Sequence, residues 1–404
     1  MATPLFRTAL VLGLMSAVGP FAIDMYLPAL PAIGAGLGGS VPAMQGTITA
    51  YFIAFGLAQM IYGPWADQAG RKLPILVGLA VFLLGSVLCA GAGSVQALTA
   101  GRAVQGLGAA AVMVVPRAIV RDLYTGHEAT RLMATIMLVI SVSPFLAPLA
   151  GALTMQAFGW RAIFAVLAAA AALSILLAVL AQPETLPRDR RQPVSARVML
   201  ATMAMLLRHR GFMALTLLGA FAIASFFVFI AQASFVYSAA FGLTPTQFSY
   251  AFAVNALGFF ASSQVAAGLG MRFGARRVMV VASTGFAAAT VGLWLLALAG
   301  LASLPVTMAG LFLGNAFLGL VIPTAMVMAL EDQGEAAGMA SSLGGTIQML
   351  AGGVLVAVTA PFFDGTVLPM LSAIALCGAL AFVLSRVVAA LPPAAPVPAP
   401  GHQA

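Results

Sequence analysis

Long apolar segments recur along the whole chain, and they restrict its fold more than any other feature of the sequence. The first of them runs from Thr8 to Ile33 and contains a single charged residue, Asp24. A run of about 20 apolar residues is long enough to cross a lipid bilayer as a helix. Of all residues, 62% are hydrophobic and 7% are charged, whereas soluble domains carry about 25% charged residues. The chain is therefore predicted to be an integral membrane protein.

The apolar segments predict helices, because they are rich in Ala, Leu, Gly, Val and Met and lack the alternating pattern of barrel strands. Breaks at proline, glycine and charged clusters divide the chain into twelve spans. We expect an all-α membrane protein with an N-terminal six-helix half (1–182), a cytoplasmic linker (183–210), a C-terminal six-helix half (211–390) and a disordered Pro/Ala-rich tail (391–404). The expected spans are 8–28, 46–66, 74–93, 97–119, 130–153, 160–181, 212–235, 246–268, 277–298, 303–329, 336–358 and 367–388.

Basic residues fall almost entirely on one side of this arrangement. The loops 29–45, 236–245, 299–302 and 359–366 on the other side contain no Lys or Arg, and Arg161 is the exception. By the positive-inside rule, both termini and the linker are expected in the cytoplasm. The net charge of +8 is thus a sign of topology, and no nucleic-acid partner is expected. Besides the arginines of the linker, the basic side carries Arg7, Arg71, Lys72, Arg121, Arg131, Arg272, Arg276, Arg277 and Arg386.

Asp24 is the residue that most suggests a function. A carboxylate inside hydrocarbon is costly unless it is paired, hydrated or protonated, so such acids often mark proton or ion pathways. The expected span 8–28 places Asp24 nearer its outer end than its middle. Arg102, in the fourth span, also needs a partner, because a guanidinium does not become neutral. Asp24 is the candidate partner; the alternative is that Arg102 extends to the outer interface.

Three local motifs resemble those of the major facilitator superfamily. The loop GPWADQAGRK (Gly63–Lys72) resembles its signature Gly-x-Leu-Ala-Asp-Arg-x-Gly-Arg-Lys, with Trp65 and Gln68 as departures, and a weaker copy, AGLGMRFGARR, follows the eighth span. RAVQGLGAAA, which begins at Arg102, resembles the motif Arg-x-x-Gln-Gly-x-Gly. SPFLAPLAG is similar to an antiporter element, and its matching positions are Pro144, Pro148 and Gly151.

Further strings narrow the resemblance to one branch of that superfamily. AIDMYLPALPAI, RDLY, GWRAIF, PETLP and the long string from Phe235 to Gln264 are similar to the bicyclomycin- and chloramphenicol-resistance (Bcr/CflA) drug efflux family. The resemblance implies proton-coupled drug efflux across a bacterial cytoplasmic (inner) membrane, with Asp24 and Arg102 as coupling residues and the proton gradient as energy source. It also implies a gating role for the loop after the second span. The expected gating residues are Gly63, Asp67, Gly70, Arg71 and Lys72, with Arg117 and Arg121 as partners of the loop; the alternative is a charged turn that only fixes topology.

A drug site is expected to be a largely apolar cavity with a few polar anchors. Each candidate could instead serve helix packing alone. No enzyme activity, cofactor or metal site is expected, because the two cysteines lie in apolar spans and the three histidines are scattered. The expected partners are a small drug, protons and the lipid bilayer, and the chain is expected to be a monomer. The candidates are Tyr26, Tyr51, Met137, Phe226, Phe229, Gln232, Asn255 and Gln348.

Two other functional readings remain open at the level of sequence. Within transporters, the substrate could be a small metabolite such as an amino acid, dipeptide or sugar. Outside transporters, the chain could be a channel or a membrane scaffold, although neither needs a gating loop.

Overall fold

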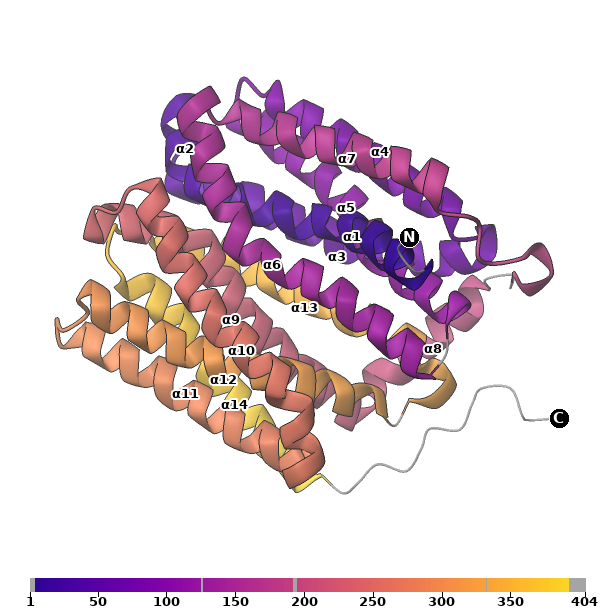
Figure 1. The fold of residues 1–404 in the computed structure, drawn as a ribbon. Helices are drawn as coiled ribbons and strands as arrows, with labels where there is room; N and C mark the ends of the chain where they lie inside the picture. Colours follow the sequence, from indigo (N-terminus) through magenta and orange to yellow (C-terminus); the bar gives the residue numbers. More distant parts are fainter. Residues whose placement is uncertain (1–3, 125, 192–194, 332, 392–404) are drawn as a thin grey trace. The chain divides into compact units, whose positions relative to one another are not determined.

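The computed structural model describes residues 4–124, 126–191, 195–331 and 333–391, and these residues form helices joined by short connections (Figure 1). Within the described residues, twelve helical segments are long and apolar enough to cross a membrane, and no strand is present. The prediction of an all-α protein with twelve spans is therefore confirmed. Residues 392–404 of the predicted tail lie outside the described residues.

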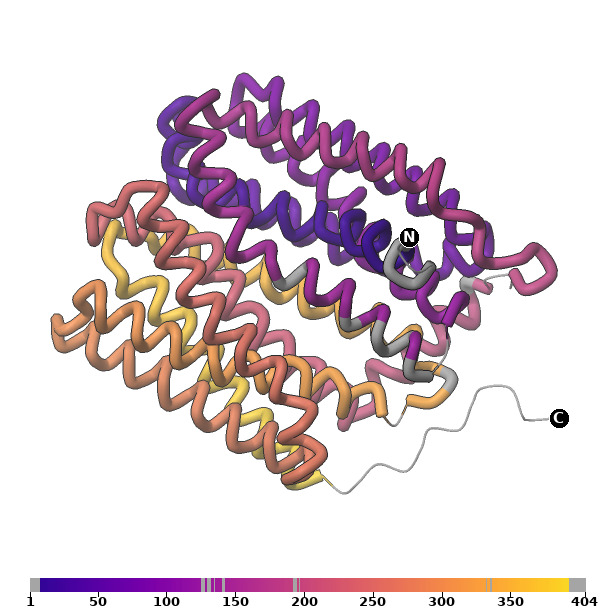
Figure 2. The backbone as a smooth tube through the Cα atoms, in the orientation of Figure 1, coloured from indigo at the N-terminus to yellow at the C-terminus, as the bar shows by residue number. Residues whose placement is uncertain are grey.

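The chain divides into two compact units. The N-terminal unit comprises Met1–Val194 with Thr244–Tyr250, and the C-terminal unit comprises Ser195–Leu243 with Ala251–Ala404. The helices of the N-terminal unit, indigo to magenta in Figure 2, are α1 (Pro4–Asp24), η1 (Leu27–Ala29), α2 (Leu30–Leu37), α3 (Val41–Ala69), α4 (Lys72–Ala90), α5 (Val95–Leu123), α6 (Gly126–Phe158) and α7 (Arg161–Ala181).

The region predicted as a linker is partly helical: it holds η2 (Arg188–Arg190) and α8 (Ala196–Arg208). The remaining helices are α9 (Arg210–Phe241), α10 (Pro245–Phe273), α11 (Ala275–Leu298), α12 (Leu304–Glu331), η3 (Gly334–Ala336), α13 (Ala337–Thr359), η4 (Ala360–Phe362) and α14 (Leu368–Ala390).

The first span is longer than predicted. The prolines of LPALP suggested an end at residue 28, but η1 and α2 continue the helical path, and Thr8–Leu37 forms one candidate span. Pro28 and Pro31 lie within the first two residues of η1 and α2, where a helix needs no backbone N–H from them. The expected loop 29–45 is therefore mostly helical.

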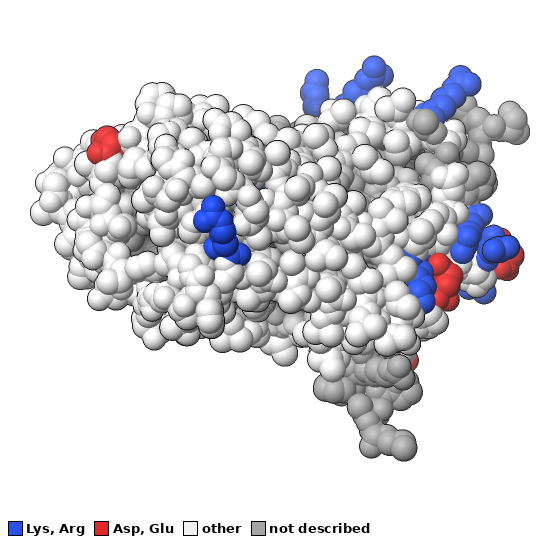
Figure 3. Space-filling model, turned by 90° about the horizontal axis from the view of Figure 1, so that it is seen from above, with Lys and Arg blue, Asp and Glu red and all other residues white. Residues whose placement is uncertain are grey.

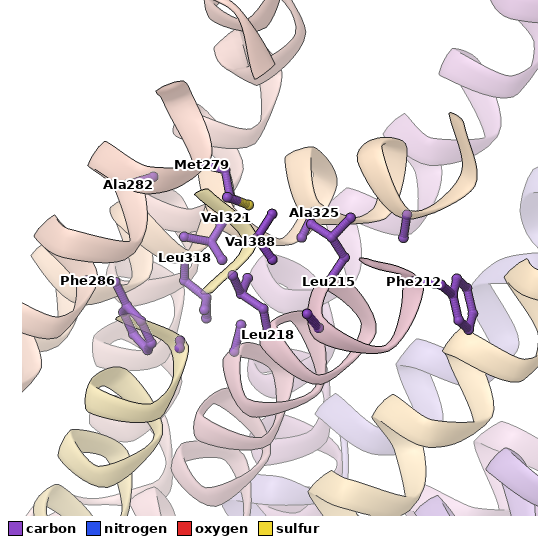
Figure 4. Packing of buried hydrophobic residues seen from close by; sticks show 14 of the residues in the cluster. Phe212, Leu215, Leu218, Met279, Ala282, Phe286, Leu318, Val321, Ala325 and Val388 are labelled. Carbon is purple, nitrogen blue, oxygen red and sulfur yellow. The ribbon is translucent and has the colours of Figure 1, made fainter. Parts of the chain in front are cut away.

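Each unit has an apolar core of its own. In the N-terminal unit, Leu12, Leu79 and Val112 are fully buried in one cluster that joins α1, α4 and α5. In the C-terminal unit, the corresponding cluster is formed by α9, α11, α12 and α14 together with residues of α8 and α13, and Figure 4 shows Leu218, Phe286 and Leu318 within it. The surface is also apolar: the face seen in Figure 3 carries few charged side chains over most of its area. Such a surface fits a lipid environment, in which close packing holds helices together.

The two units share a pattern of backbone contacts. A Cβ at Gly106 on α5 would lie 2.4 Å from the Tyr51 carbonyl oxygen on α3, and a Cβ at Gly319 on α12 would lie 2.2 Å from the Phe259 carbonyl oxygen on α10. These contacts place α5 and α12 in equivalent roles. Four residues before each glycine stand Arg102 and Asn315, which are therefore positional counterparts.

Candidate functional site

Asp24 is the last residue of α1 and lies at the break between α1 and η1. It stands close to the middle of the span Thr8–Leu37, so the prediction that it lies near the outer end was wrong, because the span continues through the prolines. Its residue surface is 6% exposed. The acid is therefore both buried and deep within its span.

One helix, α6, holds the chain at Asp24. The Ser143 hydroxyl donates a hydrogen bond of 2.8 Å to Asp24 Oδ2. Eight residues further along α6, a Cβ at Gly151 would lie 2.1 Å from the Met25 carbonyl oxygen. A larger residue at Gly151 would therefore displace the backbone next to the acid. Pro144 and Pro148, the other residues of the antiporter element, lie inside α6 between these two contacts.

Arg102 on α5 is fully buried and lies between two tyrosine rings. Its guanidinium carbon is 4.6 Å from the centre of the Tyr26 ring and 4.4 Å from that of Tyr51. Such cation–π contacts each contribute about 2 kcal/mol when desolvated. Both rings are held in place: the Tyr26 hydroxyl donates to Thr47 Oγ1 at 2.7 Å, because the Thr47 proton is used on its own helix, and the Tyr51 hydroxyl donates to the Gly19 carbonyl at 3.1 Å.

Hydrogen bonds join the same guanidinium to α1 and, through Gln105 of its own helix, to α4. Arg102 Nη1 donates to the Ala22 carbonyl of α1 at 3.0 Å and to the Gln105 side-chain oxygen. Gln105 in turn donates to the Ser86 hydroxyl of α4 at 2.8 Å. Two further guanidinium nitrogens, Nε and Nη2, are buried without a partner among the described residues.

The structure does not pair Arg102 with Asp24. The ion pairs between described residues include neither of them, and the partners of Arg102 are aromatic faces, a carbonyl and an amide. The alternative, in which Arg102 reaches the outer interface, is also wrong, because its residue surface is 0% exposed. Instead of pairing with each other, Asp24 accepts from Ser143 of α6, and Arg102 donates to Ala22 of α1 and to Gln105.

A second cluster surrounds the predicted gating loop, which connects α3 to α4. The Arg71 guanidinium forms ion pairs with Asp67 and with Asp122 at the end of α5, the latter at 2.7 Å from Nε. Thr185 also donates to Asp122, at 3.0 Å. We call Asp67, Arg71, Asp122 and Glu184 the gating cluster.

Glu184 joins this cluster through the backbone of the loop. Its carboxylate accepts from the N–H groups of Arg71 at 2.8 Å, Lys72 at 3.2 Å and Leu186 at 3.0 Å. Burial by itself would raise the pKa of Glu184, but these donors and the Arg191 guanidinium outweigh it, so its pKa lies below the ordinary range. At Gly70, φ is +97° and a Cβ would lie 2.5 Å from Glu184 Oε2, so only glycine fits.

The other predicted gating residues have different positions. Arg117 and Arg121 were expected as partners of the loop, but Arg71 finds Asp122 instead, and no ion pair between described residues involves either arginine. Lys72 donates to the Val179 carbonyl of α7 at 3.0 Å. Gly63 lies inside α3.

The candidate drug-binding residues are divided between the two units. In the N-terminal unit, Tyr26 and Tyr51 form the walls around Arg102, whereas Met137 on α6 is exposed. In the C-terminal unit, Phe226 stacks on Phe259 with ring centres 5.8 Å apart.

The remaining candidates also lie within the C-terminal unit. Phe229 stacks on the Phe252 ring with centres 5.6 Å apart. Gln232 donates to Thr359 at 3.0 Å, and Asn255 donates to the Ala251 carbonyl of its own helix at 3.0 Å. Gln348 packs against Gly219 of α9, where a Cβ would lie 2.9 Å from its Nε2.

Sequence reasoning missed several residues that complete these sites. Ser143 was part of a quoted motif but was not assigned to Asp24, and Asp122 and Glu184 lay within the strings RDLY and PETLP. A usable signal existed for the two acids, since each follows the end of a long apolar segment on the basic side. For Ser143 no such signal existed, because its partner depends on how α6 is rotated.

The arrangement can bury one ionisable acid, hold one cation and anchor a loop at helix ends. Among the described residues, no group of three His, Cys, Asp or Glu side chains could hold a metal ion. Two helical units of this kind, with an intramembrane acid in one of them, define a multi-pass membrane transporter.

Comparison with known proteins identifies the family. The model of the Major Facilitator Superfamily matches residues 12–356, so the chain belongs to this superfamily of transporters and is not an enzyme. It is 34% identical over 381 residues to the uncharacterized MFS-type transporter YdgK of Bacillus subtilis, covering 93% of this chain and 94% of the relative.

Two further matches support the fold and the branch. A bicyclomycin resistance protein homolog of Haemophilus influenzae is 30% identical over 378 residues, covering 92% of this chain and 93% of the relative. The predicted resemblance to the drug-resistance branch is thereby confirmed. A crystal structure of a D-xylose-proton symporter has a TM-score of 0.77 at 15% identity, covering 97% of this chain and 99% of that chain, and supports the fold alone.

Proposed function

We propose that this transporter exports small amphipathic drugs in exchange for protons, with Asp24 as the proton-coupling group. One observation carries the proposal: a carboxyl group lies near the middle of a span, is 6% exposed, and has a serine hydroxyl but no cation as its partner among the described residues. Because no ion pair between described residues holds Asp24 in its ionised form, the acid can gain and lose a proton as its surroundings change. The bicyclomycin resistance homolog supports drugs as the substrate class.

The contacts suggest how proton binding drives the cycle by alternating access. The ionised carboxylate accepts the Ser143 hydrogen bond, whereas the protonated form needs less solvation and tolerates a drier site. Protonation from outside would release the drug, and proton loss to the inside would restore the drug-binding state. Since α6 contacts the chain at both Asp24 and Met25, movement of α6 would change the surroundings of the acid.

The energetics are adequate for this exchange. A proton crossing a potential of about 100 mV releases about 2.3 kcal/mol, and one pH unit adds about 1.4 kcal/mol. Together they support a drug gradient on the order of several hundred-fold for one-to-one exchange.

The other parts have proposed roles as well. Arg102 holds α1, α4 and α5 around the acid and presents fixed positive charge. The gating cluster holds the loop between α3 and α4 in one conformational state. Aromatic faces such as Phe226 and Phe229 offer apolar surface for the drug. We further propose a monomer in the bacterial inner membrane, with both termini in the cytoplasm.

Transport in proteoliposomes tests the proposal. Wild-type protein should accumulate bicyclomycin- or chloramphenicol-type drugs when a pH gradient is imposed, and a protonophore should abolish accumulation. Asp24→Asn should retain binding of the drug but lose accumulation driven by the gradient. Accumulation by Asp24→Asn equal to wild type would refute Asp24 as the coupling group. Flux that ignores the pH gradient and does not saturate would indicate a channel, and a panel of amino acids, dipeptides and sugars tests the metabolite alternative.

A further inference from the structure

A small cavity inside the C-terminal unit contains a polar group that the proposed function does not use. It is lined by Ser225 and Phe229 of α9, Phe286 and Thr290 of α11, Leu311, Gly314 and Asn315 of α12, and Ile374 of α14. Its volume of about 10 Å³ admits one water molecule. Phe286, labelled in Figure 4, belongs both to this cavity and to the apolar core.

Asn315 brings an unpaired donor to the cavity. The residue is 7% exposed, and its Nδ2 has no hydrogen-bond partner among the described residues. An unsatisfied N–H group inside a membrane costs several kcal/mol. The amide therefore favours any group that accepts a hydrogen bond and fits the space.

Two hydroxyl oxygens determine which further hydrogen bonds an occupant of the cavity can form. The Ser225 hydroxyl donates to the Ala222 carbonyl at 2.7 Å, and the Thr290 hydroxyl donates to the Phe286 carbonyl at 2.8 Å. Each hydroxyl proton is thus used on its own helix, and only acceptor lone pairs remain for the cavity. The occupant must accept from Asn315 and donate to these oxygens.

This combination selects a neutral hydroxyl-type group. A carbonyl only accepts, an anion would meet two acceptor oxygens, and a cation would meet the amide N–H donor. We propose that the cavity is a binding site for one resident water molecule, which accepts from Asn315 Nδ2 and donates to Ser225 Oγ and Thr290 Oγ1. With about three hydrogen bonds, the water would be as well satisfied as typical buried waters.

The position of the site in the fold gives it a structural meaning. Asn315 is the counterpart of Arg102, as the matching contacts of Gly106 and Gly319 indicate. In the N-terminal unit, the Arg102 side chain bonds α1 directly and reaches α4 through Gln105 of its own helix. In the C-terminal unit, the shorter side chain of Asn315 links α9, α11 and α12 through a water molecule, without any ionisable group.

Hydroxyl-radical footprinting of the protein in lipid nanodiscs tests this site. Radicals form from bound water on irradiation and modify the side chains next to it, so Phe286 and Leu311 should be labelled although they are 2% and 4% exposed. Phe212, 1% exposed in the same unit but remote from the cavity lining, is the matched control and should remain unlabelled. Asn315→Leu and Asn315→Ala should each reduce labelling of Phe286 to the level of Phe212.

Each other outcome would overturn the proposal. Labelling of Phe286 no higher than that of Phe212 in wild-type protein would mean a dry cavity, whatever the variants do. Labelling that persists in both Asn315 variants would mean that the amide does not hold the water. Loss of labelling when a transported drug with a hydroxyl group is bound would assign the cavity to the substrate hydroxyl instead. None of these results depends on whether Asp24 couples protons.

Discussion

The hydrogen bond from Ser143 to Asp24 makes a quantitative prediction about proton coupling. The bond is 2.8 Å long and both residues are buried, so solvent cannot replace it. A hydrogen bond to a charged group contributes about 1.5–3 kcal/mol, and it favours the ionised carboxylate. Removing it by Ser143→Ala should therefore make proton loss harder, by about one to two pH units at about 1.4 kcal/mol per unit.

The measurement is the initial rate of drug transport in proteoliposomes as a function of pH. The midpoint of the pH profile should move upward in Ser143→Ala by about one to two units, with the maximal rate less affected. Ser174→Ala, at a buried serine of α7, is the matched control and should leave the midpoint unchanged. Equal midpoints for Ser143→Ala and wild type would refute the reasoning, because the bond would then not set the protonation of Asp24.

Three further substitutions test the contacts around the two clusters. Gly151→Ala places a methyl group 2.1 Å from the Met25 carbonyl oxygen and should reduce the transport rate. Gly292→Ala is the control, because a Cβ there would meet no neighbouring atom within 4 Å, and it should leave the rate unchanged. Equal transport rates for the two variants would contradict the role of the contact between Gly151 and Met25. Arg102→Lys should lose the stacked geometry between the two tyrosine rings, which should lower the free energy of unfolding by on the order of 2 kcal/mol. The midpoint of thermal unfolding in detergent should fall accordingly. An unchanged midpoint would argue against the cation–π contacts. Glu184→Gln should lower the free energy of unfolding by less than about 1 kcal/mol at neutral pH. Since the pKa of Glu184 is lowered in the folded state, this loss of stability is present above the ordinary pKa of 4.5 and should vanish as pH falls further. A stability difference from wild type that grows on acidification would contradict the lowered pKa.

The distribution of buried charge suggests different roles for the two units. The buried acid and the buried guanidinium both belong to the N-terminal unit, and the counterpart of Arg102 in the C-terminal unit is the neutral Asn315. Proton coupling is accordingly proposed for the N-terminal unit. The stacked phenylalanines of α9 and α10 make the C-terminal unit a source of apolar contact surface for the drug.

Several features of the candidate sites could be predicted from particular residues. Asp24 was recognised because a single acid in a long apolar run is costly wherever it lies in the membrane. The motif from Gly63 to Lys72 was recognised from its local spacing, and the structure places it at the end of α3 and the start of α4, with Gly70 and Arg71 between the two helices. Arg117 and Arg121 were predicted as partners of this loop, but Asp122, the neighbour of Arg121 in sequence, forms the ion pair with Arg71. Which of two neighbouring residues faces the loop depends on the direction of the last turn of α5.

The sequence by itself determined the class of protein, the number of spans and the location of the unusual charges. These follow from composition summed over about 20 residues, so they do not depend on how the helices are rotated. Only the tertiary structure decided that Asp24 is bonded to Ser143, that Arg102 lies between Tyr26 and Tyr51, and that Asn315 Nδ2 has no partner among the described residues. Such pairings depend on helix rotation and depth, which are set by close backbone contacts such as that of Gly151 with Met25.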